Sequence, residues 1–331
     1  MNRRLVITGI VATIGFTVVT GSLLFINIVK GEEYSKKAYS QQMKNQIISP
    51  KRGAILDTNG SVLAQSISVD TVSINPSNVK YTNNKTVEPE KLAQIFSEIF
   101  DITYEDALAK AQSKKTVEII AKKVEKEKVT KLQDWIKENN ISTGINIDED
   151  TKRSYPNNNL ASNLIGFCGD DNTGLAGLEE KWNDTLTGTS GKIVTAKANG
   201  GEAISDENEQ YVAEENGSNI YLTIDINIQK IAEKYLAQAV TENQCEKGGT
   251  VIIMNPQSGD ILAMASNPDY NLNQPRDSTA TGLQSTWDTL SSEDKSNALY
   301  KLWRNKAVSD LYEPGSTFKL ITSSIGLEEG K

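Results

Sequence analysis

Apolar and charged positions follow different patterns along the chain, and the first change of pattern comes near residue 30. Residues 5–29 contain no charged side chain, and Arg3 and Arg4 stand directly before them. Because an α-helix rises about 1.5 Å per residue, this stretch can cover about 37 Å, which exceeds a hydrocarbon core of about 30 Å. The pattern predicts a cytoplasmic tail over residues 1–4 and a single transmembrane helix over residues 5–29.

A cleavable signal peptide is the alternative for this segment. The apolar core of such a peptide has about 7–15 residues and ends at a small-x-small cleavage site. The nearest triplet of that kind, Ala-Tyr-Ser at residues 38–40, lies well beyond the apolar run, so an uncleaved anchor is favoured. The arginines keep the amino terminus in the cytoplasm, although Lys30, Lys36 and Lys37 weaken this charge rule. Most of the chain is then extracytoplasmic, on a single-pass protein of the cell membrane.

The region that follows has the mixed periodicity of an α+β domain. Two short apolar runs flank an Asp-Thr-Asn-Gly turn, so residues 52–66 are expected to form a β-hairpin. Apolar residues at helical spacing predict one helix within residues 88–100 and another over residues 127–139, with a short strand at 116–121 between them. Neither helix carries residues whose chemistry suggests a site.

Gly, Asn and other polar residues dominate residues 153–219. We expect loops here, clamped around one short helix at residues 177–186, and we interpret residues 193–219 as a connection between two bodies. Asp170 with Asp171, and Asp57 with Asn59 in the hairpin, could suggest metal ligands. Both pairs lack the further oxygen ligands of a calcium loop, so a solvated loop and a structural turn are preferred, and no metal or cofactor is expected.

From residue 221 onwards the pattern becomes strongly amphipathic. Apolar residues recur at helical spacing from Ile228 to Val240 and include Ile231 and Tyr235, with Asp225 placed to cap the helix, so we expect a helix packed against a large body. Two apolar runs joined by a Pro-Gln-Ser-Gly turn then predict an antiparallel hairpin within residues 248–268. A long polar stretch follows.

The amino-acid composition limits which ligands and catalytic groups this protein can use. The net charge is −8, with 24% charged residues and no long basic block, which argues against nucleic-acid binding. The sequence has no histidine, so Ser-His-Asp triads, Cys-His dyads and His-containing metal sites are excluded. Acid–base chemistry must then use lysine, tyrosine or carboxylates. For Cys168 and Cys245, which form no CxxC pattern, buried thiols are favoured and a disulfide is the alternative.

The pattern Ser-x-x-Lys occurs three times, at Ser77/Lys80, Ser292/Lys295 and Ser316/Lys319. Alone it is weak, and the first two matches are explained better as a surface turn and the cap of an exposed helix. Ser316 differs because Pro314 and Gly315 interrupt the chain before it and a helix-forming stretch follows. That stretch offers several apolar side chains for burial, namely Phe318, Leu320, Ile321, Ile325 and Leu327.

A helix beginning near Ser316 would place its hydroxyl and the amine of Lys319 on one face. A serine hydroxyl needs a neighbouring base to become a nucleophile, and without histidine lysine is the plausible base. A lysine has an ordinary pKa of about 10.4, so an environment that lowers the pKa by about three units is required. A helix amino terminus favours that shift and also offers backbone N–H groups to a developing oxyanion. Ser316 is therefore the candidate nucleophile and Lys319 the candidate base.

The stretch NKAVSDLYEPGSTFK, residues 305–319, resembles the first active-site motif of the penicillin-binding serine transpeptidases. Four earlier stretches are similar, in order, to class B, monofunctional penicillin-binding proteins: RGAILDTNGSVLA, RSYPNNNLAS, GLAGLEEKWNDTLTGTSG and GGTVIIMNPQSGDILAMASNPDYN. The chain looks closest to the division and sporulation subtype, including the stage V sporulation protein D type. This resemblance implies a non-catalytic, dimerisation-type pedestal over residues 30–220 and the amino-terminal part of a transpeptidase domain, an antiparallel sheet with helices, over residues 221–331.

The resemblance also implies a reaction. Ser316 would attack a D-Ala-D-Ala stem peptide of peptidoglycan, with Lys319 as base, and a second strand would accept the acyl group to form a cross-link. β-Lactams would trap Ser316. The implied partner is a polytopic glycan polymerase of the shape, elongation, division and sporulation (SEDS) type, together with other wall-synthesis membrane proteins.

One departure from the family pattern concerns two further motifs. The family carries Ser-x-Asn and Lys-Ser/Thr-Gly motifs downstream of the nucleophile, and neither follows Lys319 here. The sequence is therefore interpreted as an inactive amino-terminal fragment of a longer transpeptidase. Two alternatives remain: a bitopic scaffold that recruits wall-synthesis partners without catalysis, and a β-lactam sensor or hydrolase of the same superfamily.

Overall fold

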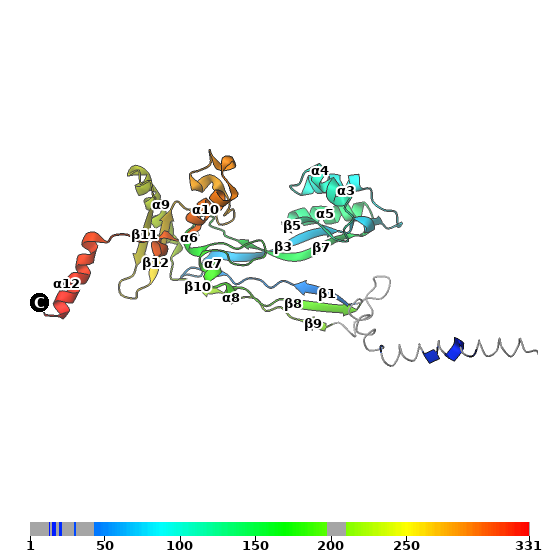
Figure 1. The fold of residues 1–331 in the computed structure, drawn as a ribbon, viewed down its shortest axis with the longest axis horizontal. Helices are drawn as coiled ribbons and strands as arrows, with labels where there is room; N and C mark the ends of the chain where they lie inside the picture. The colour runs from blue at the N-terminus through cyan, green and yellow to red at the C-terminus, as the bar shows by residue number, and fades with distance from the viewer. Residues whose placement is uncertain are drawn as a thin grey trace, which may run out of the picture. The chain divides into compact units, whose positions relative to one another are not determined.

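The computed structural model describes residues 13, 15–17, 20–21, 30, 43–196 and 210–330 (Figure 1). The predicted cytoplasmic tail and most of the predicted transmembrane helix, residues 5–29, lie outside the described residues. Among the residues that are described, no helix is both long enough and apolar enough to span a membrane. The chain divides into two compact units, one made of residues 1–48 and 190–214 and the other of residues 49–189 and 215–331.

The first unit contains a three-stranded antiparallel sheet in the order β1 (Met43–Ile48), β8 (Gly191–Ala196) and β9 (Gln210–Val212). The register of the first pair runs from Met43 opposite Ala196 to Ile48 opposite Gly191. Strands therefore lie within residues 193–219, which the sequence analysis interpreted only as a connection. That interpretation was wrong because backbone pairing does not require the large apolar side chains whose scarcity suggested a linker.

The second unit is built on a five-stranded sheet whose longest strand is β3 (Val62–Ile74). Its other strands are β2 (Ile55–Leu56), β5 (Glu118–Val124), β7 (Ile145–Ser154) and β10 (Ile220–Tyr221). β3 pairs antiparallel with β2 through the predicted hairpin, in which Gly60 takes a φ of +83°, a conformation that glycine adopts at little cost. β3 also pairs with β7 from Gln65 opposite Ser154 to Ile74 opposite Ile145.

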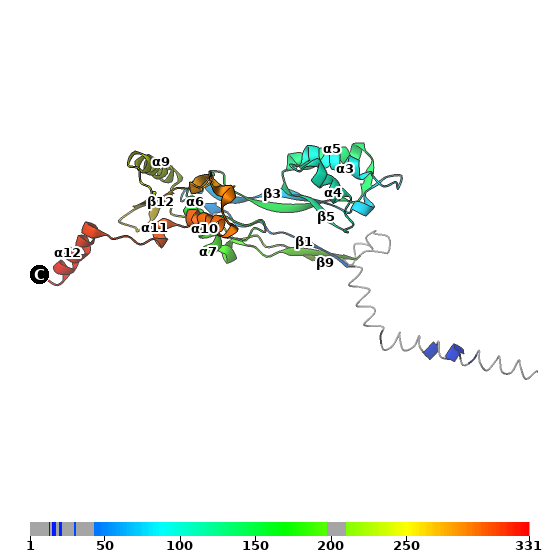
Figure 2. The same ribbon diagram turned by 45° about the horizontal axis from the view of Figure 1, so that its top comes forward.

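Three helices gather over one end of β3 and β7 in both views (Figures 1 and 2). They are α3 (Pro89–Ile99), α4 (Tyr104–Ala111) and α5 (Lys126–Glu138). Leu92, Phe96 and Leu132 are completely or almost completely buried among them, together with Val72 and Ile74 of β3. The helices and the strand predicted for residues 88–139 are confirmed. Two small elements at the edge of this cluster are the one-turn helix η1 (Pro76–Asn78) and the pair of strands β4 (Lys80–Tyr81) and β6 (Ile141–Thr143).

A second hydrophobic core lies near the other end of β3. It joins Leu63 of β3 to Phe167, Leu186 and Tyr270. The short helices around it are α6 (Ser162–Ile165), α7 (Gly177–Lys181), α8 (Asn183–Leu186) and α10 (Ser292–Trp303), with the one-turn helices η3 (Ser278–Thr281) and η4 (Trp287–Thr289) before α10. The single helix predicted for residues 177–186 is thus two helices, which meet at Trp182.

The predicted amphipathic helix and hairpin are confirmed as α9 (Ile226–Glu242), β11 (Gly249–Met254) and β12 (Ile261–Asn267). Asp225 caps α9 by accepting hydrogen bonds from the backbone N–H groups of Asn227 and Ile228. Ala232 and Leu236 pack against the hairpin, but Ile231 and Tyr235 are 56% and 60% exposed. The expected burial of those two was wrong because the hairpin covers only part of the apolar stripe. The mixed α+β fold is confirmed.

Candidate active site

Ser316 lies in a one-turn helix, η5 (Gly315–Phe318), which runs directly into α12 (Lys319–Glu328). Gly315 has a φ of +52°, and the N–H of Thr317 donates to the carbonyl of Pro314 at 3.1 Å, so the chain turns sharply into the helix. The backbone N–H of Lys319 donates to the carbonyl of Ser316. The prediction that a helix begins at or near Ser316 is confirmed, and Lys319 follows within one helical turn.

The two candidate side chains are exposed and are not joined to each other. Both Ser316 and Lys319 are solvent-exposed, and no hydrogen bond links the Ser316 hydroxyl to the Lys319 amine in the part of the chain that the structure describes. The apolar residues expected to be buried on this helix are exposed as well: Phe318 52%, Leu320 75%, Ile321 52%, Ile325 57% and Leu327 80%. That expectation was wrong. The turn before Ser316 and the helix itself form from local backbone bonds, whereas burial needs a packing surface that the described residues do not supply.

The two other Ser-x-x-Lys matches have different surroundings. Ser77 lies in η1 while Lys80 begins a strand, so no helix carries both residues. Ser292 and Lys295 share α10, where the amine of Lys295 lies 5.9 Å from the ring centre of Trp287. The cap of that helix is the preceding residue, Ser291, which accepts from the N–H of Asp294 at 3.1 Å. Helical spacing alone therefore does not separate Ser292 from Ser316.

The segment before the candidate nucleophile is fixed to the hairpin through α11 (Lys306–Ser309). The amine of Lys306 donates to the carbonyls of Lys247 and Asn267 at 2.9 and 3.2 Å. Burial lowers the pKa of Lys306. Asn305 caps α11 and donates to the sulfur of Met264 at 3.4 Å. Neither anchoring residue was predicted from the sequence, although each lies within the stretch that carries the family resemblance.

The aspartate pairs that could suggest metal ligands have structural roles. Asp57 is completely buried: its Oδ1 accepts from the N–H groups of Asn59 and Ser61 and holds the turn, and its Oδ2 accepts from the N–H of Ile226 at the start of α9. Asp171 accepts from the backbone and the hydroxyl of Thr173 within its own loop. In the described ranges, no group of three or more His, Cys, Asp or Glu residues is arranged to hold a metal ion.

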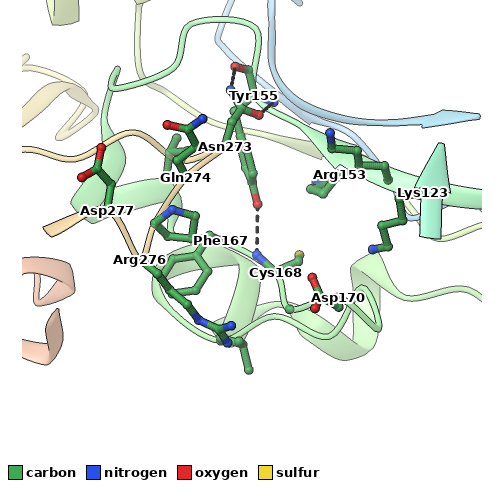
Figure 3. Close-up of a pocket in the computed structure, with 15 residues that line it drawn as sticks. Lys123, Arg153, Tyr155, Phe167, Cys168, Asp170, Asn273, Gln274, Arg276 and Asp277 are labelled. Atoms are coloured by element: carbon green, nitrogen blue, oxygen red, sulfur yellow. Dashed lines mark hydrogen bonds between the residues drawn. The ribbon is translucent and has the colours of Figure 1, made fainter. Parts of the chain in front are cut away.

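The cysteines are both free thiols. Cys245 is exposed, which contradicts the preference for a buried thiol, and Cys168 is half-buried. Cys168 contacts a buried polar network that the sequence analysis also missed: its Sγ donates to Glu179 Oε2 at 3.2 Å, and its N–H donates to the hydroxyl of Tyr155 at 3.1 Å (Figure 3).

Two arginines share the carboxylate at the centre of this network. Arg52 Nε lies 2.7 Å from Glu179 Oε2, and Arg153 Nε lies 2.7 Å from Glu179 Oε1. Arg52 also binds the carbonyl of Glu179 and the side chains of Asn183 and Thr187. Each of the three charged residues belongs to one of the stretches quoted for the family resemblance, but the letters alone do not reveal that they meet.

Two family descriptions match this chain. The Penicillin-binding Protein dimerisation domain matches residues 47–222, and the Penicillin binding protein transpeptidase domain matches residues 249–331, which include Ser316 and Lys319. The first match alone covers more than half of the chain.

Curated relatives and solved structures agree with these matches. The chain is 30% identical over 332 residues to "Peptidoglycan D,D-transpeptidase FtsI" of Buchnera aphidicola subsp. Schizaphis graminum, with 100% of this chain and 53% of the relative covered. It is 31% identical over 334 residues to "Stage V sporulation protein D" of Bacillus subtilis, with 100% and 47% covered. The chain thus spans about half the length of the curated relatives it matches.

Two solved structures share the fold. The penicillin-binding protein PBP2 of Helicobacter pylori, solved in complex with MreC, aligns with a TM-score of 0.60 at 23% identity and covers 86% of this chain and 52% of its own. A peptidoglycan synthetase of Bifidobacterium adolescentis aligns with a TM-score of 0.56 at 25% identity, covering 87% and 52%. With both family descriptions matched in order over an α+β fold of this type, the chain belongs to the class B penicillin-binding proteins, close to the FtsI and stage V sporulation protein D groups.

Proposed function

We propose that this protein is a peptidoglycan D,D-transpeptidase in which Ser316 is the acyl-enzyme nucleophile and Lys319 the general base. The transpeptidase-domain match that contains both residues carries the proposal, because it ties the Ser-x-x-Lys helix to a family of serine transpeptidases. The helical run through Ser316 and Lys319 and the absence of histidine from the whole sequence support it.

In the proposed reaction, Lys319 Nζ in its neutral form takes the proton from Ser316 Oγ while Oγ bonds to the carbonyl carbon of the penultimate D-alanine. The bond from that carbon to the terminal D-alanine nitrogen breaks, and the proton goes to the departing amine. An amine of a neighbouring strand then attacks the acyl-enzyme, restores the Ser316 hydroxyl and forms the cross-link. One amide bond replaces another, so no ATP is consumed. A β-lactam would acylate Ser316 by opening of its ring amide.

The test is labelling with fluorescent penicillin of the protein expressed from its complete reading frame. We expect labelling of the parent and of Ser292→Ala, since Ser292 belongs to the alternative Ser-x-x-Lys pair, and no labelling of Ser316→Ala. Lys319→Ala should slow acylation by about 10²–10⁴-fold, whereas Lys295→Ala should label at the parent rate. Full labelling of Ser316→Ala would refute the assignment of Ser316 as the acyl-enzyme nucleophile.

The proposal extends to location and partners. A single-pass anchor over residues 5–29 with a cytoplasmic amino terminus would present the described domains to the wall, and a SEDS-type polymerase is the proposed partner. MreC is the protein bound to the Helicobacter pylori relative in the solved complex, which supports the proposal that this chain also binds a protein partner. A pull-down from a strain that carries a tagged Ser316→Ala protein tests this. Recovery of the polymerase supports the partner, and its absence under crosslinking rejects it.

If the protein acts only as a scaffold, catalysis is dispensable. Growth of a depleted strain on Ser316→Ala would support that function, and loss of viability would reject it. The match to the dimerisation domain covers more than half of the chain, and this observation supports the scaffold function.

A further inference from the structure

A pocket of about 430 Å³, whose lining residues Figure 3 shows, includes Arg153 of the buried Glu179 network in its wall. Its walls come from strands β5 and β7, from the loop after α6 and from the loop after β12. The charged side chains that line it are Lys123, Lys152, Arg153, Arg276, Asp170 and Asp277. Four cations therefore face two carboxylates, in a chain whose net charge is −8. Such a local excess of one sign in a concave site concentrates the field and attracts the opposite charge.

Two of these cations have no partner of their own. Neither the side chain of the half-buried Lys152 nor that of the exposed Arg276 makes a hydrogen bond or ion pair with any described residue. Among the described residues, the amine of Lys123 donates to the neutral side chain of Asn172, at 3.3 Å. Of the two carboxylates, Asp277 is already engaged by the N–H of Thr279 at 2.9 Å. The donors of the pocket are therefore largely unused.

The Glu179 network leaves a net positive charge at the pocket wall, which is the charge of the lining residue Arg153, because Glu179 balances only one of its two arginines. Glu179 is one carboxylate shared by two guanidinium groups, Arg52 and Arg153, and all three are at least nine-tenths buried. Nε and Nη1 of Arg153 are used, but its Nη2 is buried and has no acceptor. Charges that are shielded from solvent are screened less than exposed ones, so this excess acts on the adjacent pocket.

The other walls suit an organic ligand. Phe167, Leu175 and Leu272 give apolar surface, and the side chain of Gln274 supplies an amide. The volume falls in the range of about 300–1,000 Å³ that is usual for small-molecule sites. Ser316 is not among the lining residues, so the pocket does not belong to the proposed reaction centre.

We propose that this pocket binds an organic ligand through a carboxylate or phosphate group, which Lys152 and Arg276 contact directly and the buried Arg153 attracts. Charge-assisted hydrogen bonds from lysine and arginine to oxyanions are strong, and the planar guanidinium group of arginine also matches the geometry of a carboxylate or phosphate. The two sources of this chemistry that an extracytoplasmic protein would meet are the carboxylates of wall peptides and glycerol-phosphate groups. The pocket goes beyond the proposed transpeptidase function and does not depend on acylation of Ser316.

Calorimetric titration of the Ser316→Ala protein, expressed from its complete reading frame, tests the site without interference from acylation. The probes are a disaccharide-tetrapeptide wall fragment, the same fragment with amidated carboxylates, and glycerol 3-phosphate. We expect saturable binding of the unmodified fragment or of glycerol 3-phosphate below about 10 mM. Lys152→Met and Arg276→Gln should each weaken it about tenfold, whereas Lys131→Met, which removes an exposed lysine of α5, should leave it unchanged.

Each outcome is decisive. Binding of the wall fragment that amidation abolishes identifies the carboxylate source, and binding of glycerol 3-phosphate identifies the phosphate source. The proposal is overturned if neither the unmodified wall fragment nor glycerol 3-phosphate binds saturably. It is also overturned if Lys152→Met and Arg276→Gln bind the probe as tightly as the protein without these substitutions. Absence of penicillin labelling of the parent protein, with retained probe binding by Ser316→Ala, would reject the proposed reaction and leave the pocket assignment standing.

Discussion

Arg52 and Glu179 lie 127 positions apart in the chain, yet Arg52 Nε donates to Glu179 Oε2 at 2.7 Å with both side chains almost completely buried. The contact joins the chain just before β2 to helix α7. Arg153, at the end of β7, binds the other oxygen of the same carboxylate. A single acidic side chain thus fixes three segments that are distant in sequence.

Glu179→Gln should destabilise the protein by about 3–5 kcal/mol, because two buried guanidinium groups would lose the counter-charge that they share. Urea unfolding followed by circular dichroism measures the effect. The matched control is Asp101→Asn, which removes the exposed partner of Lys128 and should change the free energy of unfolding by less than about 1 kcal/mol. Equal effects of the two substitutions would contradict the role of burial.

Gln229 ties α9 to the edge of β12. It is completely buried, accepts from the N–H of Met264 at 2.7 Å and donates to the carbonyl of the same residue at 2.9 Å. Gln229→Leu conserves most of the volume but leaves these backbone groups unpaired, so we expect a loss of about 1–3 kcal/mol in the free energy of unfolding. Gln238→Leu, at an exposed position of the same helix, should have little effect. A stability of Gln229→Leu equal to that of the parent would refute this account.

Glu233 gives the stability a defined dependence on pH. Burial raises the pKa of Glu233 above its ordinary value of 4.5, although hydrogen bonds from Gln229 and from the N–H of Ala161 oppose the shift. The folded chain therefore holds this proton more tightly than the unfolded chain. The resulting stabilisation is fully present below pH 4.5 and is lost as the pH rises through the folded-state pKa.

Glu233→Gln should remove this dependence while its amide oxygen still accepts from Ala161. The stability of the parent relative to this variant should then fall as the pH rises above 4.5, as measured by urea titrations at several pH values. Glu242→Gln, at an exposed position of the same helix, is the control and should parallel the parent. Parallel curves for all three proteins would show that Glu233 does not carry the effect.

The two cysteines should react at very different rates. Burial raises the pKa of Cys168 to about 12, and its thiol is held by Glu179, so little reactive thiolate forms at neutral pH. Cys245 is exposed. Iodoacetamide followed by mass spectrometry should therefore modify Cys245 first in the native protein, and both residues at similar rates in urea. Earlier modification of native Cys168 would contradict the burial described here.

Local patterns predicted most of the regular elements. The spacing of apolar residues from Ile228 to Val240 and the cap at Asp225 placed α9 correctly, because both signals act within the helix itself. The same holds for the turn before Ser316. Exposure was less predictable: Ile231 and Phe318 have the spacing of core residues and are exposed, since spacing does not tell how wide a surface covers the helix.

Contacts between distant segments left almost no local signal. Nothing in the spacing of Arg52, Arg153 and Glu179 indicates that they meet, since the pairing of β3 with β7 and the folding of the loop before α7 bring them together. The basic pocket was missed for the same reason, because Lys152 and Arg276 come from regions more than a hundred residues apart. The choice of Ser316 over Ser292 came from the Pro314-Gly315 turn and the helix-forming stretch after it, and the family resemblance supplied the order of the domains.

Strand β3 contributes to two hydrophobic cores of the second unit, through Leu63 and Ala64 at one end and Val72 and Ile74 at the other. A continuous strand cannot leave one core and keep its ladder with β7 intact, so loss of either core weakens the other. Unfolding of residues 49–189 should therefore be cooperative, with amide hydrogens along the centre of β3 exchanging only through the global opening reaction. In kinetic terms, the strand makes the two cores a single unit that resists partial opening.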